Sequence, residues 1–144
     1  MRPFSFRIHY LGYLFRKSTE TVNRQQKVGR VKVRAYWDKY KKDIRCPETE
    51  QRASDDLNIT KYAVDSVNIR FTRELAVVYK LDFNFVDEKD GLTLLDYIQK
   101  RLDYMKTLTP APEIRIREYE AAYRAVVRAG GKHKKDLTPE ELNQ

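Results

Sequence analysis

The feature that most constrains this chain is a pair of helical apolar stripes that follow one another after residue 92. In the first, the apolar side chains that recur every three or four residues are Leu94, Leu95, Ile98, Leu102 and Met105. In the second, they are Ile116, Tyr119, Tyr123 and Val126. This spacing places such side chains on one face of a helix. Residues 107–111 break the first pattern and the Gly130-Gly131 pair ends the second, so the sequence predicts a helical hairpin.

A second, shorter pair of helices is predicted upstream. Ser54 is an expected N-cap, followed by two acidic residues that interact favourably with the free N–H groups of a first turn. The apolar face of this helix is formed by Leu57, Val64 and Val67. Thr72 is the next expected cap, and the side chains that its helix turns inward are Leu75, Val78 and Tyr79. Only residues 68–71 separate the two helices, a length typical of a hairpin.

Between the two hairpins, residues 82–91 form a non-helical excursion. It ends in Asp90-Gly91, a turn dipeptide in which glycine adopts a positive φ at little cost. At the other end of the chain, Thr138-Pro139-Glu140-Glu141 combines the spacing of a capping box with a proline at the first helical position. A short terminal helix is therefore expected.

Positive charge is concentrated at the beginning of the chain. Residues 1–46 contain 13 lysines and arginines and three acids, a net charge of +10. The remaining 98 residues contain 16 basic and 18 acidic residues, a net charge of −2. The composition turns polar and acidic over residues 46–54. We therefore expect a basic N-terminal segment, 1–46, and a helical region, 47–144.

Two segments of the basic region allow two interpretations each. Apolar residues between 4 and 10 alternate as in a strand, whereas Phe4, Ile8, Leu11 and Phe15 fall on one helical stripe, which favours a helix. Apolar residues between 31 and 37 also alternate. However, Val33, Trp37, Tyr40 and Ile44 have helical spacing. Strand and helix both remain open for this second segment.

The residues around the excursion resemble the ankyrin-repeat family. This sequence resembles the turn of that family and the start of its inner helix, and the matching residues are Asp82, Asn84, Asp87, Gly91, Thr93 and Leu95. The run from Val126 to His133 resembles the end of a C-terminal capping repeat. The resemblance covers about residues 57–137 and implies an all-α fold of stacked helical hairpins. Because stacked repeats need neighbours to bury a continuous core, the basic segment is expected to act as a non-standard N-terminal cap.

The residues needed for metal or covalent chemistry are scarce. One cysteine and two widely separated histidines give no zinc spacing. Asp87, Glu88 and Asp90 do not fit a calcium loop, and Asp87 and Asp90 are instead expected to accept backbone hydrogen bonds in the turn. The chain also lacks a glycine-rich phosphate loop and a Gly-x-Ser-x-Gly elbow. We expect no catalytic activity, metal or cofactor.

The location expected from the sequence is the cytosol. Apolar runs such as Ala76-Val77-Val78-Tyr79 are far shorter than the roughly 20 residues of a membrane-spanning helix. The single cysteine cannot form an intramolecular disulfide, and the start of the sequence lacks the apolar stretch of a secretory signal.

The function that the resemblance implies is a protein interaction module of the adaptor or inhibitor type. Its basic segment would steer an acidic partner protein. The expected contact residues lie on the excursion or off the apolar stripe of the following helix, and they are Phe83, Phe85, Glu88, Lys89, Tyr97 and Tyr104. Tyr97 and Tyr104 are expected to be exposed, and one of the two phenylalanines to be buried under the turn.

Two alternatives use the basic region instead. Residues 27–45 interleave cations with aromatic rings, which is typical of single-stranded nucleic-acid binding. The residues that would do so are Arg30, Lys32, Arg34, Tyr36, Trp37, Lys39, Lys41 and Lys42. The competing interpretation, that Trp37 and Tyr40 point into the core while the cations face solvent, is favoured by the helical spacing. A third hypothesis is attachment of residues 4–17 to an anionic membrane surface.

Overall fold

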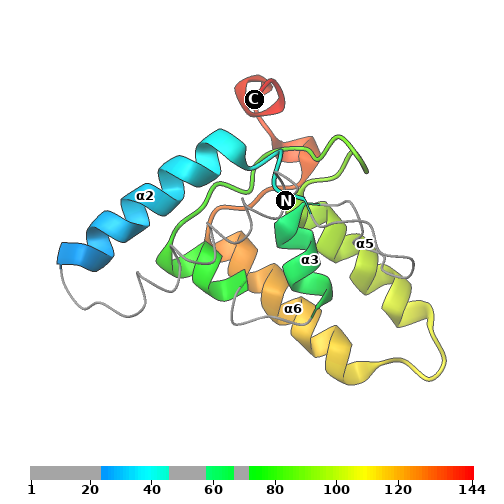
Figure 1. Ribbon diagram of the computed structural model, residues 1–144. Coiled ribbons are helices and arrows are strands. Elements are labelled where there is room, and N and C mark those ends of the chain that lie inside the picture. Colours follow the sequence, from blue (N-terminus) through cyan, green and yellow to red (C-terminus); the bar gives the residue numbers. More distant parts are fainter. Residues whose placement is uncertain (1–23, 46–57, 67–71) are drawn as a thin grey trace, which may run out of the picture.

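The computed structural model describes residues 24–45, 58–66 and 72–144 (Figure 1). Its elements in chain order are α2 (Arg24–Tyr40), α3 (Ile59–Asp65), the π-helical turn η1 (Glu74–Val78), α5 (Leu94–Thr107), α6 (Glu113–Arg128), the 3₁₀ turn η2 (Lys134–Asp136) and α7 (Pro139–Leu142). These ranges contain no strand, only one isolated bridge between Arg45 and Asn58. The all-α prediction is confirmed for them, and the open choice for residues 31–40 is resolved as helix.

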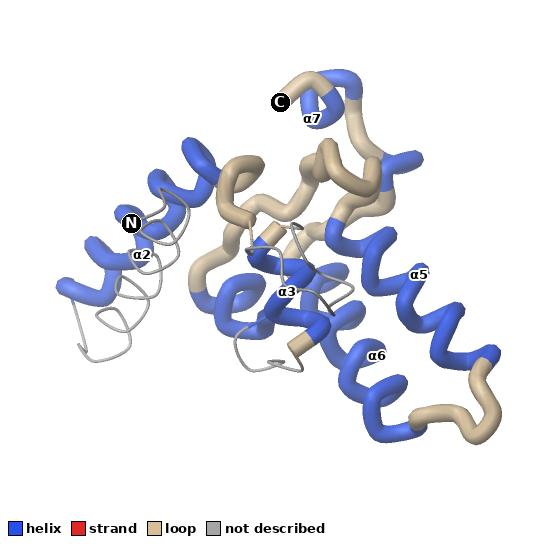
Figure 2. Tube along the Cα trace, turned by 45° about the vertical axis from the view of Figure 1, so that its right-hand side comes forward, coloured by secondary structure: helices blue, strands red, loops and turns tan. Residues whose placement is uncertain are grey.

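The downstream hairpin forms as predicted. Helices α5 and α6 lie side by side and antiparallel, joined by the connection at residues 108–112 (Figures 1 and 2). Thr93 caps α5 by accepting the N–H of Asp96. Pro112 occupies the N-cap position of α6, and the connection contains a cis Thr109–Pro110 bond. The apolar stripe of α5 is buried along its whole length, with Ile98 fully inaccessible.

The glycine pair ends α6 for a clear geometric reason. The N–H of Gly130 donates to the carbonyl of Val127, and that of Gly131 to the carbonyl of Val126, which together make a Schellman motif. Gly130 has a φ of 89°, a left-handed conformation that favours glycine. A Cβ on Gly131 would lie 2.3 Å from the Val126 side chain. Both positions therefore require glycine. Beyond them, Thr138 and Glu141 form the predicted capping box of α7.

The upstream pair departs from the prediction. Helix α3 begins at Ile59 and is capped by Asn58, whereas the predicted cap Ser54 lies outside the described residues. Thr72 is itself helical, so it is not an N-cap, which would precede the first helical residue. The chain continues from it into η1. The wider i→i+5 winding of a π turn rotates the following side chains. As a result Tyr79 is buried, whereas Val78, which we expected to face inward, is exposed.

Helix α2 shares one core with the rest of the described chain. Val33, Trp37 and Ile44 belong to the same buried cluster as the stripes of α5 and α6. The loop after η1 runs past the C-terminal end of α2 before it reaches α5 (Figure 1). Figure 2 shows α3 between α2 and the α5–α6 hairpin, and α3 contacts α5. The described part of the basic segment is therefore packed on the helical region, while residues 4–17 and the expected boundary at 46/47 lie outside the described residues.

Candidate functional site

Two of the predicted contact residues, Phe83 and Phe85, are buried beneath the loop rather than presented on it. Their exposed fractions are 3% and 5%, and each packs edge to face against Trp37. The chain is extended here, so alternate side chains point to opposite sides. Leu81 and Asp87 continue the inward row. The expectation that these phenylalanines are exposed for contact is therefore wrong. Both are buried under the turn, whereas only one of them was expected to be.

Tyr97 is also buried, because α3 packs over its side of α5. Only 5% of it is exposed, and its hydroxyl donates to Asp65. Tyr104 is exposed as expected, at 56%, and Glu88 and Lys89 are exposed on the excursion. Tyr104 lies ten residues after the start of α5, which corresponds to about 15 Å along the helix. The exposed members of the predicted contact set therefore lie in two separate places.

The predicted nucleic-acid-binding residues divide between the core and the surface. Trp37 is fully inaccessible and its indole N–H donates to the carbonyl of Asp82 at 2.7 Å, so it is unavailable for base stacking. Lys41 is also buried. The residues of this set that remain exposed are Lys32, Arg34 and Lys39, and those that are partly buried are Arg30, Tyr36 and Lys42. The interpretation in which Trp37 points into the core is confirmed, whereas Lys41, which was expected to face solvent with the other cations, is buried.

A buried lysine joins α3 to the excursion. Lys61 is 1% exposed, and its Nζ lies 2.7 Å from Asp90 Oδ1 and 3.5 Å from Asp87 Oδ2. Asp87 also pairs with Arg45 at 2.7 Å and accepts the N–H of Lys89. Burial opposes ionisation of Asp87, but these donors outweigh it and hold its pKa below the ordinary value. Asp87 and Asp90 thus accept the backbone bonds predicted for the turn, and in addition they neutralise a buried cation.

A second buried cluster surrounds Asp65 at the end of α3. Its carboxylate accepts the hydroxyls of Tyr97 and Tyr119, and Arg101 Nε lies 3.5 Å away. Burial and the bond to Asp65 raise the pKa of Tyr119 to about 12, and the same causes raise the pKa of Tyr97 further. These phenols remain protonated donors at neutral pH. The cluster ties α3 to both helices of the downstream hairpin.

A third set of contacts fastens the segment after α6 to the start of α5. His133 Nδ1 lies 2.7 Å from Asp96 Oδ1, and its Nε2 lies 3.0 Å from the hydroxyl of Tyr123. Because a carboxylate only accepts, Asp96 keeps the proton of His133 on Nδ1. Asp96 also accepts the N–H of Lys134 at 2.9 Å. The order carboxylate, imidazole, hydroxyl occurs in catalytic relays, but none of these residues lines either hollow described next.

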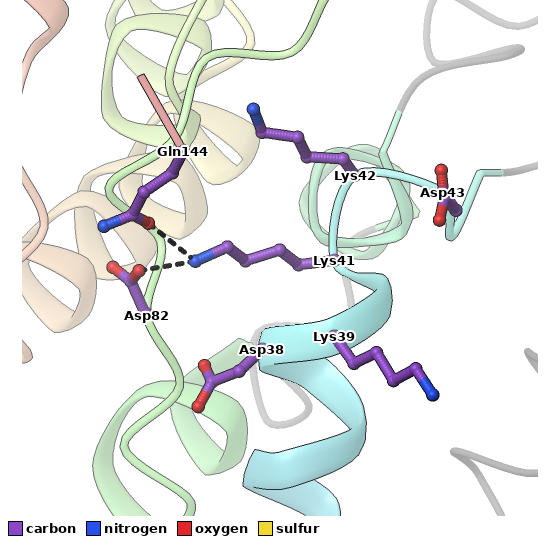
Figure 3. Close-up of a pocket in the computed structure, with 7 residues that line it drawn as sticks. All are labelled: Asp38, Lys39, Lys41, Lys42, Asp43, Asp82 and Gln144. Atoms are coloured by element: carbon purple, nitrogen blue, oxygen red, sulfur yellow. Dashed lines mark hydrogen bonds and ion pairs between the residues drawn. The ribbon is translucent and has the colours of Figure 1, made fainter. Parts of the chain in front are cut away.

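A hollow of about 690 Å³ lies between the end of α2 and the C-terminal residue (Figure 3). We call it the paired hollow, and its lining residues are Asp38, Lys39, Lys41, Lys42, Asp43, Asp82 and Gln144. Lys41 extends across it, with Nζ 2.7 Å from Asp82 Oδ2 and 3.0 Å from Gln144 Oε1. Three lysines face three aspartates in this lining, so the paired hollow has no excess of charge.

A second hollow, of about 290 Å³, lies between η1 and α6. We call it the arginine hollow, and its lining residues are Arg73, Val77, Ala121, Arg124, Ala125 and Arg128. This lining includes no acidic residue. Within the described part of the chain, none of its three guanidinium groups forms an ion pair with a carboxylate. It is the stronger candidate for an anionic ligand, because no acidic residue of its own lining offsets the three arginines.

Sequence reasoning did not identify the arginine hollow. One local signal was present: Ala121 and Ala125 lie four residues apart on α6, and so do Arg124 and Arg128. Residues four apart share a helix face, so small side chains there leave a depression beside two cations. The third cation, Arg73, comes from a turn about fifty residues earlier in the sequence. No spacing rule connects it to α6.

Across the ranges 24–45, 58–66 and 72–144, no group of three His, Cys, Asp or Glu side chains is placed to hold a metal ion. No helix in the same ranges is long and apolar enough to cross a membrane.

Comparison with known proteins found no matching family model, no matching curated protein and no matching solved structure.

Proposed function

We propose that this protein is a non-catalytic interaction module that binds an acidic partner protein through the arginine hollow. The observation that carries the proposal is a hollow whose lining combines three arginines, none of which pairs with a carboxylate among the described residues, with small and apolar side chains. Val77 is 55% exposed at this site, and Val78 and Val127 are exposed nearby in sequence. Arginine flanked by exposed apolar side chains is typical of the centre of protein interfaces. A carboxylate of the partner would pair with the guanidinium groups.

The buried polar clusters are occupied by contacts within the chain, which supports a binding role over an enzymatic one. Lys61 is surrounded by two carboxylates, and Asp65 by two phenols and a guanidinium. Such groups stabilise the fold and are unavailable to a substrate. The linings of the two hollows contain no histidine, cysteine, serine or threonine. The hydroxyl, thiol and imidazole groups of the common nucleophile–base pairs are therefore absent from these two linings.

The placement of the aromatic residues favours a protein partner over single-stranded nucleic acid. Binding of single strands combines a cationic groove with aromatic faces on which bases stack. The ring of Trp37 is instead packed against Phe83 and Phe85 in the core. The exposed Lys32, Arg34 and Lys39 can still contribute a positive field, which raises the association rate with an acidic partner.

The scaffold in this proposal is ankyrin-like, with α2 as the non-standard N-terminal cap. It is supported by the position of the excursion before the α5–α6 hairpin and by its internal bonds. Asp82 accepts the N–H of Asn84, whose side chain accepts the N–H of Lys132 near the end of the hairpin. Such bonds hold the excursion against the following hairpin, as expected for stacked repeats.

The proposal is tested by affinity capture from a native lysate with three versions of the full chain. The first is wild type, and the second replaces the hollow's cations: Arg73→Gln, Arg124→Gln and Arg128→Gln. The matched control removes the same charge elsewhere on the surface: Lys32→Gln, Arg34→Gln and Arg117→Gln. Each capture is made with and without nuclease, and circular dichroism verifies the helical content.

We expect a stoichiometric acidic protein that survives nuclease, is retained by the control and is lost with the hollow variant. Equal loss with both variants would contradict a specific role for the hollow. A set of proteins that disappears with nuclease and with the control variant would instead support nucleic-acid binding by residues 27–45.

A further inference from the structure

The residues that line the arginine hollow allow the chemical class of its ligand to be defined more narrowly than an acidic group. We propose that it is a subsite for a phosphorylated side chain of the partner protein, with the phosphoryl group held by Arg73, Arg124 and Arg128. This inference rests on the proposed function, because the phosphoryl group would be presented by the same acidic partner.

Charge is the first argument. A phosphorylated side chain carries a charge of about −1.5 to −2 at neutral pH and presents three acceptor oxygens. Three arginines line one hollow of about 290 Å³, and no acidic residue is among its lining residues. A single carboxylate, with one charge and two oxygens, would leave most of this positive charge uncompensated. The number of cations therefore matches a phosphoryl dianion better than a glutamate or aspartate.

The choice of cation is the second argument. Every cation of the hollow is arginine, whereas the internal ion pairs of the described chain use both lysine, at Lys41 and Lys61, and arginine, at Arg45 and Arg101. The planar fork of a guanidinium group matches the oxygens of phosphate with two parallel hydrogen bonds, whereas an ammonium group acts as a point charge. Arg124 and Arg128 lie one turn apart on α6, and Arg73 approaches from the start of η1. Donors from two elements can thus surround one anion.

The floor of the hollow is the third argument. Ala121 and Ala125 leave space on α6 because they lack longer side chains, and Val77 provides an apolar wall that is 55% exposed. A phosphorylated side chain has an apolar stem behind its phosphoryl group, and burial of apolar surface adds affinity. Free inorganic phosphate has no such stem. The surroundings of the arginines therefore favour an attached phosphoryl group over the free ion.

The inference is tested with defined probes on the full chain. The probes are capped phosphoserine (N-acetyl, amide), capped glutamate and inorganic phosphate, and binding is followed by the methyl NMR signals of Val77, Ala121 and Ala125. We expect saturable binding of capped phosphoserine that is about tenfold tighter than that of capped glutamate, because bonds to a dianion are stronger. Binding should be lost in the Arg73/Arg124/Arg128→Gln variant and kept in the Lys32/Arg34/Arg117→Gln control.

Three results would overturn the inference. Equal affinity for capped glutamate would make the hollow a carboxylate site. Equal affinity for inorganic phosphate would make it a small-anion site. Equal loss of binding in both variants would assign the effect to overall charge.

A separate arm distinguishes failure of the inference from failure of the proposed function. Phosphatase treatment of the lysate before capture should remove the partner from the wild-type chain. If the partner is still captured after complete dephosphorylation but is lost with the hollow variant, the interaction function stands and the phosphoryl specificity is refuted.

Discussion

The two hollows of this molecule contain basic residues in similar numbers and use them in opposite ways. In the paired hollow, Lys41 is buried and bonded to Asp82, and lysines and aspartates are present in equal number. In the arginine hollow, three exposed guanidinium groups have no acidic neighbour in the lining. Local charge density alone therefore does not distinguish the two hollows. What separates them is whether the lining itself supplies the counter-charge.

Lys61 is the most deeply paired cation of the described chain, so its removal should have the largest effect on stability. Lys61→Met leaves Asp90 without its ammonium partner in a largely buried position. We expect the free energy of unfolding to fall by about 3–5 kcal/mol. Urea denaturation at neutral pH measures this change. The double variant Lys61→Met/Asp90→Asn should lose less than the single variant, and a loss below about 1 kcal/mol in the single variant would contradict the paired assignment.

Tyr119 tests the buried cluster around Asp65. Tyr119→Phe removes a hydroxyl that donates to the carboxylate, and we expect a loss of about 1.5–3 kcal/mol at neutral pH. Because folding raises the pKa of this phenol from 10.0 to about 12, its contribution is complete below pH 10 and is lost as the pH rises toward 12.

Ultraviolet absorbance of tyrosinate during alkaline titration measures this directly. The wild-type chain should show a late-titrating group that is missing in Tyr119→Phe, provided that circular dichroism still reports folded protein at that pH. If the tyrosine missing from the curve of the variant is one that titrates near pH 10, and the late-titrating part is unchanged, Tyr119 is not held in its protonated form.

Lys41 should have a smaller effect, because its partner Asp82 is one-third exposed. Lys41→Met keeps the length of the side chain and removes its charge. We expect a loss of about 1 kcal/mol in urea denaturation and no change in partner capture, since the paired hollow serves the fold. A variant of unchanged stability that no longer captures the partner would reverse the roles assigned to the two hollows.

The arginine hollow should have the smallest effect on stability. Arg124→Gln with Arg128→Gln removes two exposed cations that have no carboxylate partner in the described residues. We expect the free energy of unfolding to change by no more than about 0.5 kcal/mol, whereas partner binding is lost. A loss of several kcal/mol would mean that these arginines stabilise the fold and are not free for a ligand.

The elements that the sequence predicts best are those whose signals are local. The stripe of α5, the glycine stop of α6 and the capping box of α7 depend on neighbours within a few residues, and all three are present in the structure. The π turn was missed because no local pattern distinguishes it from an α-helix. It is the reason that Val78 faces solvent.

The candidate site was harder to predict, because its residues come from distant parts of the chain. The burial of Phe83 and Phe85 depends on Trp37, more than forty residues away, and Tyr97 is covered by α3. A short aromatic loop can be a contact surface or a core element with the same sequence. For the same reason, Arg73 could not be associated with Arg124 and Arg128 from spacing alone.

The most direct test of the account is chemical footprinting of arginine with phenylglyoxal on the full chain, followed by peptide mass spectrometry, with and without a polyglutamate peptide. If the arginine hollow binds an acidic partner, we expect rapid modification of Arg73, Arg124 and Arg128, and suppression of that modification by the peptide. We also expect slow modification of Arg45, which is paired with buried Asp87, with no effect of the peptide. If the peptide protects Arg34 on α2 and leaves the three arginines of the hollow reactive, the assignment of the binding surface is wrong.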